Sequence, residues 1–441
     1  MSPIAMILSQ ISEYCGHVAP WLRALVLGAA FLGLVRGGFK PGYAFCLAAV
    51  GLAVAFGQGV ETFANALNQG ATGVPTVRLL LALASLGWLG QVLREGKAVD
   101  LLADGLRRRV GDPRGRGILL SMAVGLLPGA QGARASSDCT RGVPMDDAHR
   151  AALHLWFQRL GSLALPVGAG FVVACDLGKV SLGRTAGLLL PLALAMAAVG
   201  LVTLARNLPD PAGTDAPAPG APGGLRRGLL PSLIALALAL TLPALGIPEV
   251  RATQPALRLL EGLLGLLAPV TLGAALGALL AARNLGLSSG ESLKALRAVC
   301  RTDLVVFVVG LKVFEQVALA KLPFSDDGSG AAVAGSLAGL GGAGISLACL
   351  ALPALAGFFL GGSAAALGLL LPFLLPAMGK DALLLPLAYA GAFLGETFSK
   401  SALADALAGE AFRASLEEVR WRLALPAALL ALVAALLTLA P

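Results

Sequence analysis

Long, continuously apolar segments separated by short polar stretches occupy most of the 441-residue chain. Their hydrophobicity does not alternate from residue to residue, so the pattern predicts membrane helices and not the strands of a β-barrel. The expected crossings are residues 21–35, 43–56, 77–93, 151–175, 185–205, 228–245, 257–282, 303–320, 381–401 and 423–439. We therefore predict an all-α membrane protein with about ten transmembrane helices.

One segment, residues 117–140, begins like a crossing and is then interrupted. About a dozen apolar residues precede Pro128, whereas roughly 20 are needed to cross a hydrocarbon core of about 30 Å. A helix that ends inside a bilayer is tolerated only where protein buries it or a watery cavity meets it. We interpret this segment as a re-entrant helical hairpin. The alternative is a loop that never enters the membrane.

A second apolar stretch, residues 331–375, is rich in Gly and Ala and contains its own breaks. These lie at Gly341–Gly344, Pro353, Gly361–Gly362 and Pro372. Its length suits a second re-entrant hairpin. Broken half-helices of this kind form the substrate sites of many secondary transporters.

Basic residues give the orientation of the chain. The densest group lies within residues 94–116 and comprises Lys97, Arg107, Arg108, Arg109 and Arg114. The positive-inside rule places this loop in the cytoplasm. Its first part, residues 96–110, has apolar residues at helical spacing, which predicts an amphipathic helix in the membrane interface.

Residues 207–227 divide the chain into two similar halves. They are rich in Pro, Gly and Ala and end in two arginines, so we predict a cytoplasmic linker. Residues 1–206 and 228–441 each contain three helices, a hairpin, a crossing with polar residues at its end, and a last helix. The charge pattern gives the halves opposite orientations, as in an inverted repeat. The alternative is coincidence among Ala/Leu-rich helices.

Composition supports a polytopic membrane protein and argues against several other classes. The chain is 57% hydrophobic and only 13% charged, whereas soluble domains carry about 25% charged residues. The net charge of +8 comes from loops that flank helices, which indicates topology and not nucleic-acid binding. The six cysteines form no CxxC pair and the three histidines form no HExxH motif. We therefore expect no metal site, no cofactor and no enzymatic activity.

Ionisable side chains inside a membrane are costly and need a partner or a function. Three polar groups meet this description. They are Gln131, Arg134, Ser136, Ser137 and Asp138 at the first break; His154, Gln158 and Arg159 in the next crossing; and Glu396, Ser399 and Lys400 near the end of the matching crossing in the second half. A fourth group, Lys312, Glu315 and Gln316, is expected to face a hairpin rather than to bind substrate.

The functional interpretation of these groups is a binding site near the bilayer midplane. Arg134, Arg159 or Lys400 would neutralise an anion, with help from hydroxyl groups and half-helix N-termini. Asp138 or Glu396 would bind a coupling H⁺ or Na⁺. The alternative is structural: Arg134 pairs with Asp138, and Glu396 pairs with Lys400 four residues later on the same helix face.

Four stretches carry a resemblance to a known family. In residues 125–137, Pro128, Gly132, Ala133 and Ser136 match; in residues 154–174, Trp156, Phe157 and Pro166 match; in residues 387–419, Ser399, Leu403 and Phe412 match; and residues 303–317 resemble a further segment. On these residues the chain resembles the integral-membrane family filed as domain of unknown function 401. That family is similar in layout to the ion-transporter superfamily of gluconate, citrate and dicarboxylate permeases.

The resemblance implies a fold and a class of function, but the polar signature of that family is altered. His154, Gln158, Arg159, Lys400, Ala402 and Ala404 stand where the family has other residues. We expect a secondary transporter of a small anion, with an organic anion favoured, that uses alternating access and couples to H⁺ or Na⁺. The alternative is a diverged membrane subunit or scaffold that does not transport and acts through a partner protein. By analogy we expect a homodimer in the cytoplasmic (inner) membrane of a bacterium or archaeon.

Overall fold

The protein is built from α-helices in the part of the chain that the structure describes. The structure is a computed structural model, and it describes residues 18–129, 133–140, 143–164, 168–206, 224–241, 269–322, 328–379, 384–400 and 412–439. The helices of the first half are α2 (Pro20–Arg36), α3 (Pro41–Ala55), α4 (Val60–Thr72), α5 (Val74–Glu95), α6 (Ala98–Arg109), α7 (Pro113–Gly125), α8 (Ala133–Cys139), α9 (Asp147–Ala164), α10 (Ala169–Gly178), α11 (Leu182–Gly200) and the π-helix η1 (Leu201–Ala205). The helices of the second half are α12 (Gly224–Thr241), α14 (Pro269–Leu285), α15 (Ser289–Val299), α16 (Thr302–Leu319), α17 (Ser329–Ala338), α18 (Gly341–Leu360), α19 (Ser363–Met378), α20 (Leu384–Phe398) and α22 (Leu416–Leu439).

Local sequence signals explain where several of these helices begin. α2, α3, α5 and α7 each carry a proline in the first turn, where the missing N–H is not needed. α15 begins with a capping box in which Ser288 and Glu291 exchange hydrogen bonds. The backbone N–H of Ser288, together with its hydroxyl, lowers the pKa of the exposed Glu291 carboxyl from its ordinary value.

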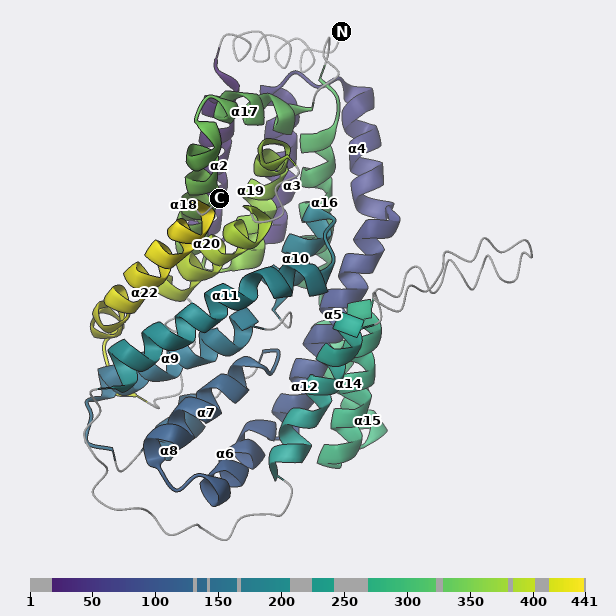
Figure 1. Cartoon of the computed structure of the whole chain (residues 1–441). Helices are drawn as coiled ribbons and strands as arrows, with labels where there is room; N and C mark the ends of the chain where they lie inside the picture. The colour runs from purple at the N-terminus through teal and green to yellow at the C-terminus, as the bar shows by residue number, and fades with distance from the viewer. Residues whose placement is uncertain are drawn as a thin grey trace.

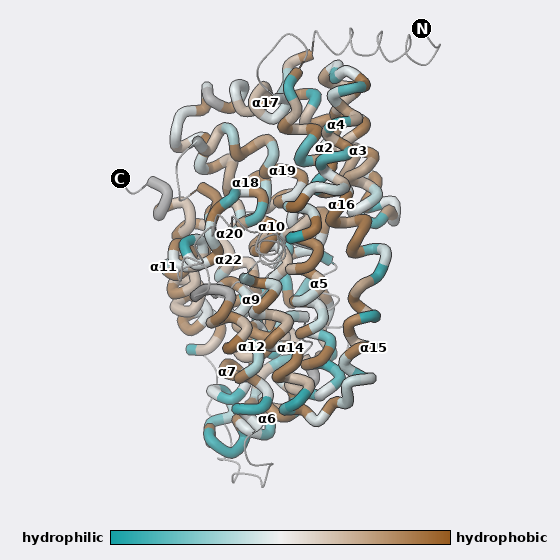
Figure 2. Tube along the Cα trace, turned by 90° about the vertical axis from the view of Figure 1, so that its right-hand side faces the viewer, coloured by the Kyte–Doolittle hydropathy of each residue, from teal (hydrophilic) through white to brown (hydrophobic). Residues whose placement is uncertain are grey.

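The hydrophobic pattern located most helices, and four of them are long and apolar enough to cross a membrane. Among the described residues these are 60–95, 182–205, 341–360 and 416–436, and five shorter apolar helices accompany them. Figure 2 shows apolar residues along most of the trace, with hydrophilic residues gathered around α6 at one end. These features are those of a multi-pass membrane protein.

Several predicted boundaries were wrong. Residues 151–175 form two helices, α9 and α10, and not one crossing; they flank the segment that contains Pro166, which lies outside the described residues. Residues 224–227, predicted as linker, belong to α12, and the rest of the linker lies outside the description. Residues 331–375 comprise most of α17, all of α18 and most of α19.

A break is present close to the one predicted at Pro128. α7 ends at Gly125, and the chain turns through Leu126–Gly129, where Gly129 has a φ of +66°. The next described helix begins at Ala133. The left-handed backbone at Gly129 is a conformation that glycine adopts without the steric penalty other residues meet.

The amphipathic helix predicted at residues 96–110 exists as α6, but its apolar face contacts protein. Leu102 and Leu106 are buried, and α6 packs against α7 and α12. At Gly224 and Gly228 of α12, a Cβ atom would collide with the backbone or side chains of α6. The apolar spacing therefore reflects helix packing, which the sequence alone does not distinguish from burial in lipid headgroups.

Helices of the two halves make corresponding contacts (Figure 1). α3 packs against α16, and α14 packs against α5. The contact between α2 and α3 in the first half corresponds to the contact between α12 and α14 in the second half. The contact of α6 with α12 corresponds in the same way to the contact of α17 with α2. α7 packs along α9 as α18 packs along α20.

Glycines allow the closest of these helix pairs to approach. In the α7–α9 pair, a Cβ on Gly125 or Gly161 would collide with backbone atoms of the other helix. In the α18–α20 pair the same holds for Gly357, Gly391 and Gly395. Small residues at such positions let helix backbones pack closely, which is the main source of helix association in a bilayer.

We predict that Gly395→Ala lowers the free energy of unfolding by about 1–3 kcal/mol, because the new methyl group overpacks the contact with Ala354. The measurement is thermal or denaturant unfolding of the detergent-purified protein. Gly187→Ala in α11 is the matched control, since a Cβ there meets nothing within 4 Å. A Gly395 variant as stable as the Gly187 variant would show that α18 and α20 are not held this closely.

Candidate functional site

A buried ion pair joins the two halves of the chain. Nη1 of Arg159, on α9, lies 2.6 Å from Oε1 of Glu396, on α20, and each side chain is only 17% exposed. The second carboxylate oxygen, Oε2, accepts a hydrogen bond from the backbone N–H of Ser363, with an N–O distance of 2.7 Å. Ser363 is the first residue of α19. We call Arg159, Glu396 and the Ser363 N–H the Arg159–Glu396 centre.

Two helix starts meet at this centre. A Cβ on Gly170, the second residue of α10, would collide with the Ser363 side chain, so the N-terminal ends of α10 and α19 are in contact. The start of a helix carries a partial positive charge on its unpaired N–H groups. The guanidinium of Arg159 and the start of α19 therefore both act on the Glu396 carboxylate, and their combined field favours an anion.

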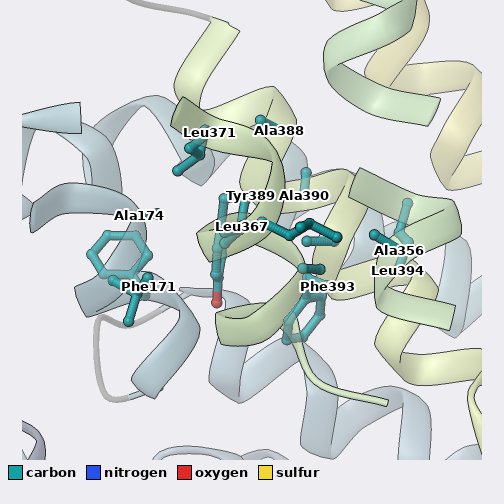
Figure 3. Close-up of a cluster of buried hydrophobic side chains, with 14 of the residues drawn as sticks. Phe171, Ala174, Ala356, Leu367, Leu371, Ala388, Tyr389, Ala390, Phe393 and Leu394 are labelled. Atoms are coloured by element: carbon teal, nitrogen blue, oxygen red, sulfur yellow. The ribbon is translucent and has the colours of Figure 1, made fainter. Parts of the chain in front are cut away.

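Aromatic rings enclose the centre on the α10 and α20 side. The guanidinium of Arg159 lies over the ring of Phe393, 5.6 Å from its centroid. Figure 3 shows Tyr389 between Phe171 and Phe393, and the centroid of its ring lies 5.3 Å and 5.9 Å from theirs. Phe393 therefore lies against the guanidinium, and the low exposure of the ion pair strengthens the attraction between its charges.

A cavity of about 420 Å³ lies at the start of α10. It is lined by Leu83, Leu86, Gly87, Gly90, Gln91 and Arg94 of α5, by Pro128 and Gly129 of the first break, by Ala169 at the start of α10, and by Ala298, Val299, Leu304 and Phe307. The lining is apolar except for Gln91 and Arg94, whose side chains are hydrogen-bonded to each other. Because Ala169 precedes Gly170 in the chain, the cavity wall lies one residue from the contact with Ser363.

Two predicted residues, Ser136 and His154, take part in a different buried network. The Oγ of Ser121 lies 3.0 Å from the Oγ of Ser136 and 2.9 Å from Nδ1 of His154. The same hydroxyl donates to the carbonyl of Gly117, at 2.7 Å. All three side chains are buried. The network ties α7, α8 and α9 together, and Ser121 was not among the predicted residues.

The other predicted residues are distributed around these two groups. Gln131 lies outside the described residues, and Arg134 is placed in α8 by its backbone only. Ser137 and Asp138 are half-buried in α8, Gln158 is half-buried in α9, and Ser399 is buried directly after α20. The centre thus contains Arg159 and Glu396 from the predicted set.

The expected local pair of Glu396 with Lys400 is not formed. α20 ends at Phe398, so the helical geometry that would bring position 400 over position 396 is lost, and Lys400 is exposed. Glu396 pairs instead with Arg159, which is 237 positions away in the chain. Sequence reasoning also missed Ser363. The start of a helix after the Gly361–Gly362 pair was the available signal, because glycine often ends one helix before another begins.

Comparison with known proteins gives the fold but not a family. No family model matches the sequence, and no curated protein sequence matches it. Among solved structures, the chain is similar to the YdaH transporter of Alcanivorax borkumensis, whose structure is described as having an unusual topology. The TM-score is 0.57 at 16% sequence identity, over 91% of this chain and 98% of that chain. The chain therefore has the helical fold of that membrane transporter, and the expected family rests on sequence resemblance alone.

We predict that Arg159→Gln and Glu396→Gln each lower the free energy of unfolding by about 3–5 kcal/mol, because each leaves a buried partner uncompensated. The double variant should lose less than the sum, by about 0.5–3 kcal/mol. A double-mutant cycle on unfolding of the purified protein measures this difference.

The control for this cycle is the pair Lys40–Asp303, whose side chains are 62% and 50% exposed at an N–O distance of 2.7 Å. Exposed pairs contribute only about 0–1 kcal/mol. If Arg159 and Glu396 show no more coupling than this control pair, the ion pair does not hold the two halves together.

Proposed function

We propose that the protein is a secondary transporter of a small anion, with an organic anion favoured, and that it works by alternating access coupled to H⁺ or Na⁺. The Arg159–Glu396 centre carries the proposal. It combines a guanidinium with the N–H at the start of a helix, and Gly170, which contacts Ser363 of the centre, follows the cavity-lining Ala169 in the chain. Guanidinium groups and helix starts are the groups that proteins use to bind carboxylates and phosphates.

The carboxylate of Glu396 indicates what the centre accepts. Its two oxygens receive one hydrogen bond from Arg159 and one from Ser363. A substrate carboxylate offers the same two acceptors and would compete with Glu396 for both donors. The largely apolar cavity lining favours an anion with an organic body over a small inorganic ion.

Cation coupling follows from the same competition. An anion that takes the place of the Glu396 carboxylate leaves that carboxylate buried without its partner, which is costly inside a membrane. A proton or a Na⁺ that joins Glu396 removes the charge. Binding of the anion and binding of the cation would then favour each other. Asp138 is the second predicted residue for this role.

The contacts between helices support two inverted repeats, residues 1–206 and 228–441, joined by the linker at residues 207–227. Each contact named above has a counterpart in the other half. In this correspondence α7 and α8 form the first hairpin, predicted near residues 117–140, and α18 and α19 form the second, predicted near residues 331–375; α7 already begins at Pro113 and α19 ends at Met378. In each half a glycine of the crossing helix lies against the hairpin backbone: Gly161 contacts α7, and Gly395 contacts α18. Alternating access in repeats of this kind is a movement of one part against the other around a fixed site.

The alternative function is a membrane subunit that does not transport. The closed Arg159–Glu396 pair favours it, because a permanent internal bridge already compensates the positive charge that an anion would need. In that case the pair is structural, and the protein acts through a partner.

We predict that small carboxylates stabilise the purified protein and that Glu396→Gln increases this effect. The glutamine keeps an oxygen acceptor for Ser363 but removes the charge that competes for Arg159, so anion affinity should rise about tenfold or more. A ligand at about a hundred times its dissociation constant adds about 2.7 kcal/mol to the free energy of unfolding. The stabilisation is measured by thermal unfolding with a panel of mono-, di- and tricarboxylates, sugar acids and inorganic anions, with and without Na⁺ at two pH values.

Two variants control this measurement. Arg159→Gln should abolish the stabilisation by every anion, whereas Asp303→Asn, which removes an exposed carboxylate, should leave it unchanged. If no anion stabilises either the unmodified protein or the Glu396 variant, the transport proposal fails. A pull-down for a partner protein is then the next experiment.

A further inference from the structure

A second buried charge cluster joins α10 to α16. The Nζ of Lys312 lies 2.5 Å from Oδ2 of Asp176 and 2.7 Å from Oε2 of Glu315. Lys312 and Glu315 are three residues apart on α16, and their side chains are 4% and 7% exposed. Asp176 comes from α10, and its side chain is 23% exposed. The predicted group Lys312–Glu315 therefore faces α10, and its partner there was not predicted.

The three ionised groups leave one net negative charge. Two carboxylates share one ammonium, so whenever Asp176 contacts Lys312 the cluster has an uncompensated charge in a buried place. Lys179, at the end of α10, is the other charged residue that acts on Glu315, but it is exposed and its field is screened by solvent. Burial of an uncompensated charge is unfavourable, and uptake of one cation removes it.

Neighbouring helices supply no other partner for this charge. α19, which packs on α10, and α17, which packs on α16, carry no ionisable side chain. Helices packed against α10 or α16 carry Glu61, Arg78, Arg94, Glu95, Arg184 and Glu396. Within the residues that the structure describes, none of these forms an ion pair with Asp176, Lys312 or Glu315.

The chemistry of the cluster selects a proton over a metal ion. The ammonium of Lys312 already occupies the space between the two carboxylates, and a Na⁺ beside it would be repelled. No group of three or more His, Cys, Asp or Glu side chains suited to a metal occurs in the described part of the chain. A proton needs no extra room, and a protonated carboxyl group still offers its carbonyl oxygen to Lys312.

The position of α10 connects this cluster to the Arg159–Glu396 centre. Its second residue, Gly170, contacts Ser363, and Asp176 lies six residues later, about 9 Å along the helix axis. α10 packs mainly on α19 and α16 mainly on α3 and α4, and both helices also contact α5. The Asp176–Lys312 pair therefore joins α10, which touches Ser363 of the Arg159–Glu396 centre, directly to α16.

We propose that Asp176, Lys312 and Glu315 form a proton-binding site that is complete only when α10 is docked on α16. Undocking leaves Lys312 paired with Glu315 on the same helix and exposes Asp176 to solvent, so the undocked state contains no uncompensated buried charge. Only the docked state has the excess negative charge that favours the proton. Proton binding and docking therefore stabilise each other. The link from docking to anion transport rests on the proposed function, but the proton site itself does not.

The test is infrared difference spectroscopy of the detergent-purified, full-length protein during pH changes between about 5 and 9, where buried carboxyl groups titrate. The protonated-carboxyl band should report about one proton per molecule. Asp176→Asn and Glu315→Gln should each abolish this band, because either change leaves a neutral pair. Lys312→Met should keep or increase it, because two carboxylates then remain without an ammonium.

Three controls and a second measurement make the outcome decisive. Lys179→Gln and Glu61→Gln, which alter exposed charges, should leave the band unchanged, and unfolding curves of each variant check that it is folded. Backbone hydrogen exchange in α10, corrected for its intrinsic pH dependence, should slow as the site becomes protonated, and Asp176→Asn should remove this change.

A protonated-carboxyl band that is absent from the unmodified protein, or that survives in both carboxylate variants, contradicts the proton site. A band without any effect on exchange in α10 contradicts its link to docking. Because no anion is added, failure of anion binding would leave these results unaffected.

Discussion

The ion pair between Arg159 and Glu396 is the interaction on which the arrangement of the two halves depends. A single charge at the centre of a membrane helix costs about 2.5–3.5 kcal/mol on insertion scales, so neither residue is tolerable alone. At an N–O distance of 2.6 Å each compensates the other, and Ser363 satisfies the remaining carboxylate oxygen. α9, α19 and α20 must therefore meet at one point. This requirement fixes the second break, at Gly361–Gly362, beside a helix of the first half.

Close packing around that point is possible because the residues that face each other across these helix contacts are small. Glycines at the α7–α9 and α18–α20 contacts bring the backbones together, and Gly170 lets α10 approach the start of α19. Bulky side chains at these positions would separate the helix starts from the charged pair. The Arg159–Glu396 centre therefore depends on glycines at these helix contacts.

The hydrophobic pattern was sufficient to predict most helices, because in a membrane protein the apolar length of a segment largely decides its structure. The break after residue 125 was predictable for the same reason. Contacts between distant segments were not. Glu396 and Lys400 have the spacing of a helical ion pair, yet the helix ends between them, and the actual partner lies in the other half. His154, predicted as a substrate-binding residue, is buried and hydrogen-bonded to Ser121, which lies in a stretch whose sequence has the pattern of an ordinary hydrophobic helix. Side chains that pair across a tertiary contact produce no periodic pattern in a single sequence, so these partners could not be predicted from it.

The central claim is that the Arg159–Glu396 centre is reached from each side of the membrane in turn. Ala169 lines the cavity and precedes Gly170, which contacts Ser363 of the centre, so Ala169→Cys in a variant without the six native cysteines reports access to this cavity. The most direct measurement is labelling of this cysteine by a membrane-impermeant thiol reagent applied to either side of sealed vesicles, with and without a stabilising carboxylate. We predict labelling from both sides, with a ratio that changes when the anion and a cation gradient are present. Labelling from one side only, under every condition, would contradict alternating access and identify the cavity as a fixed feature of a protein that does not transport.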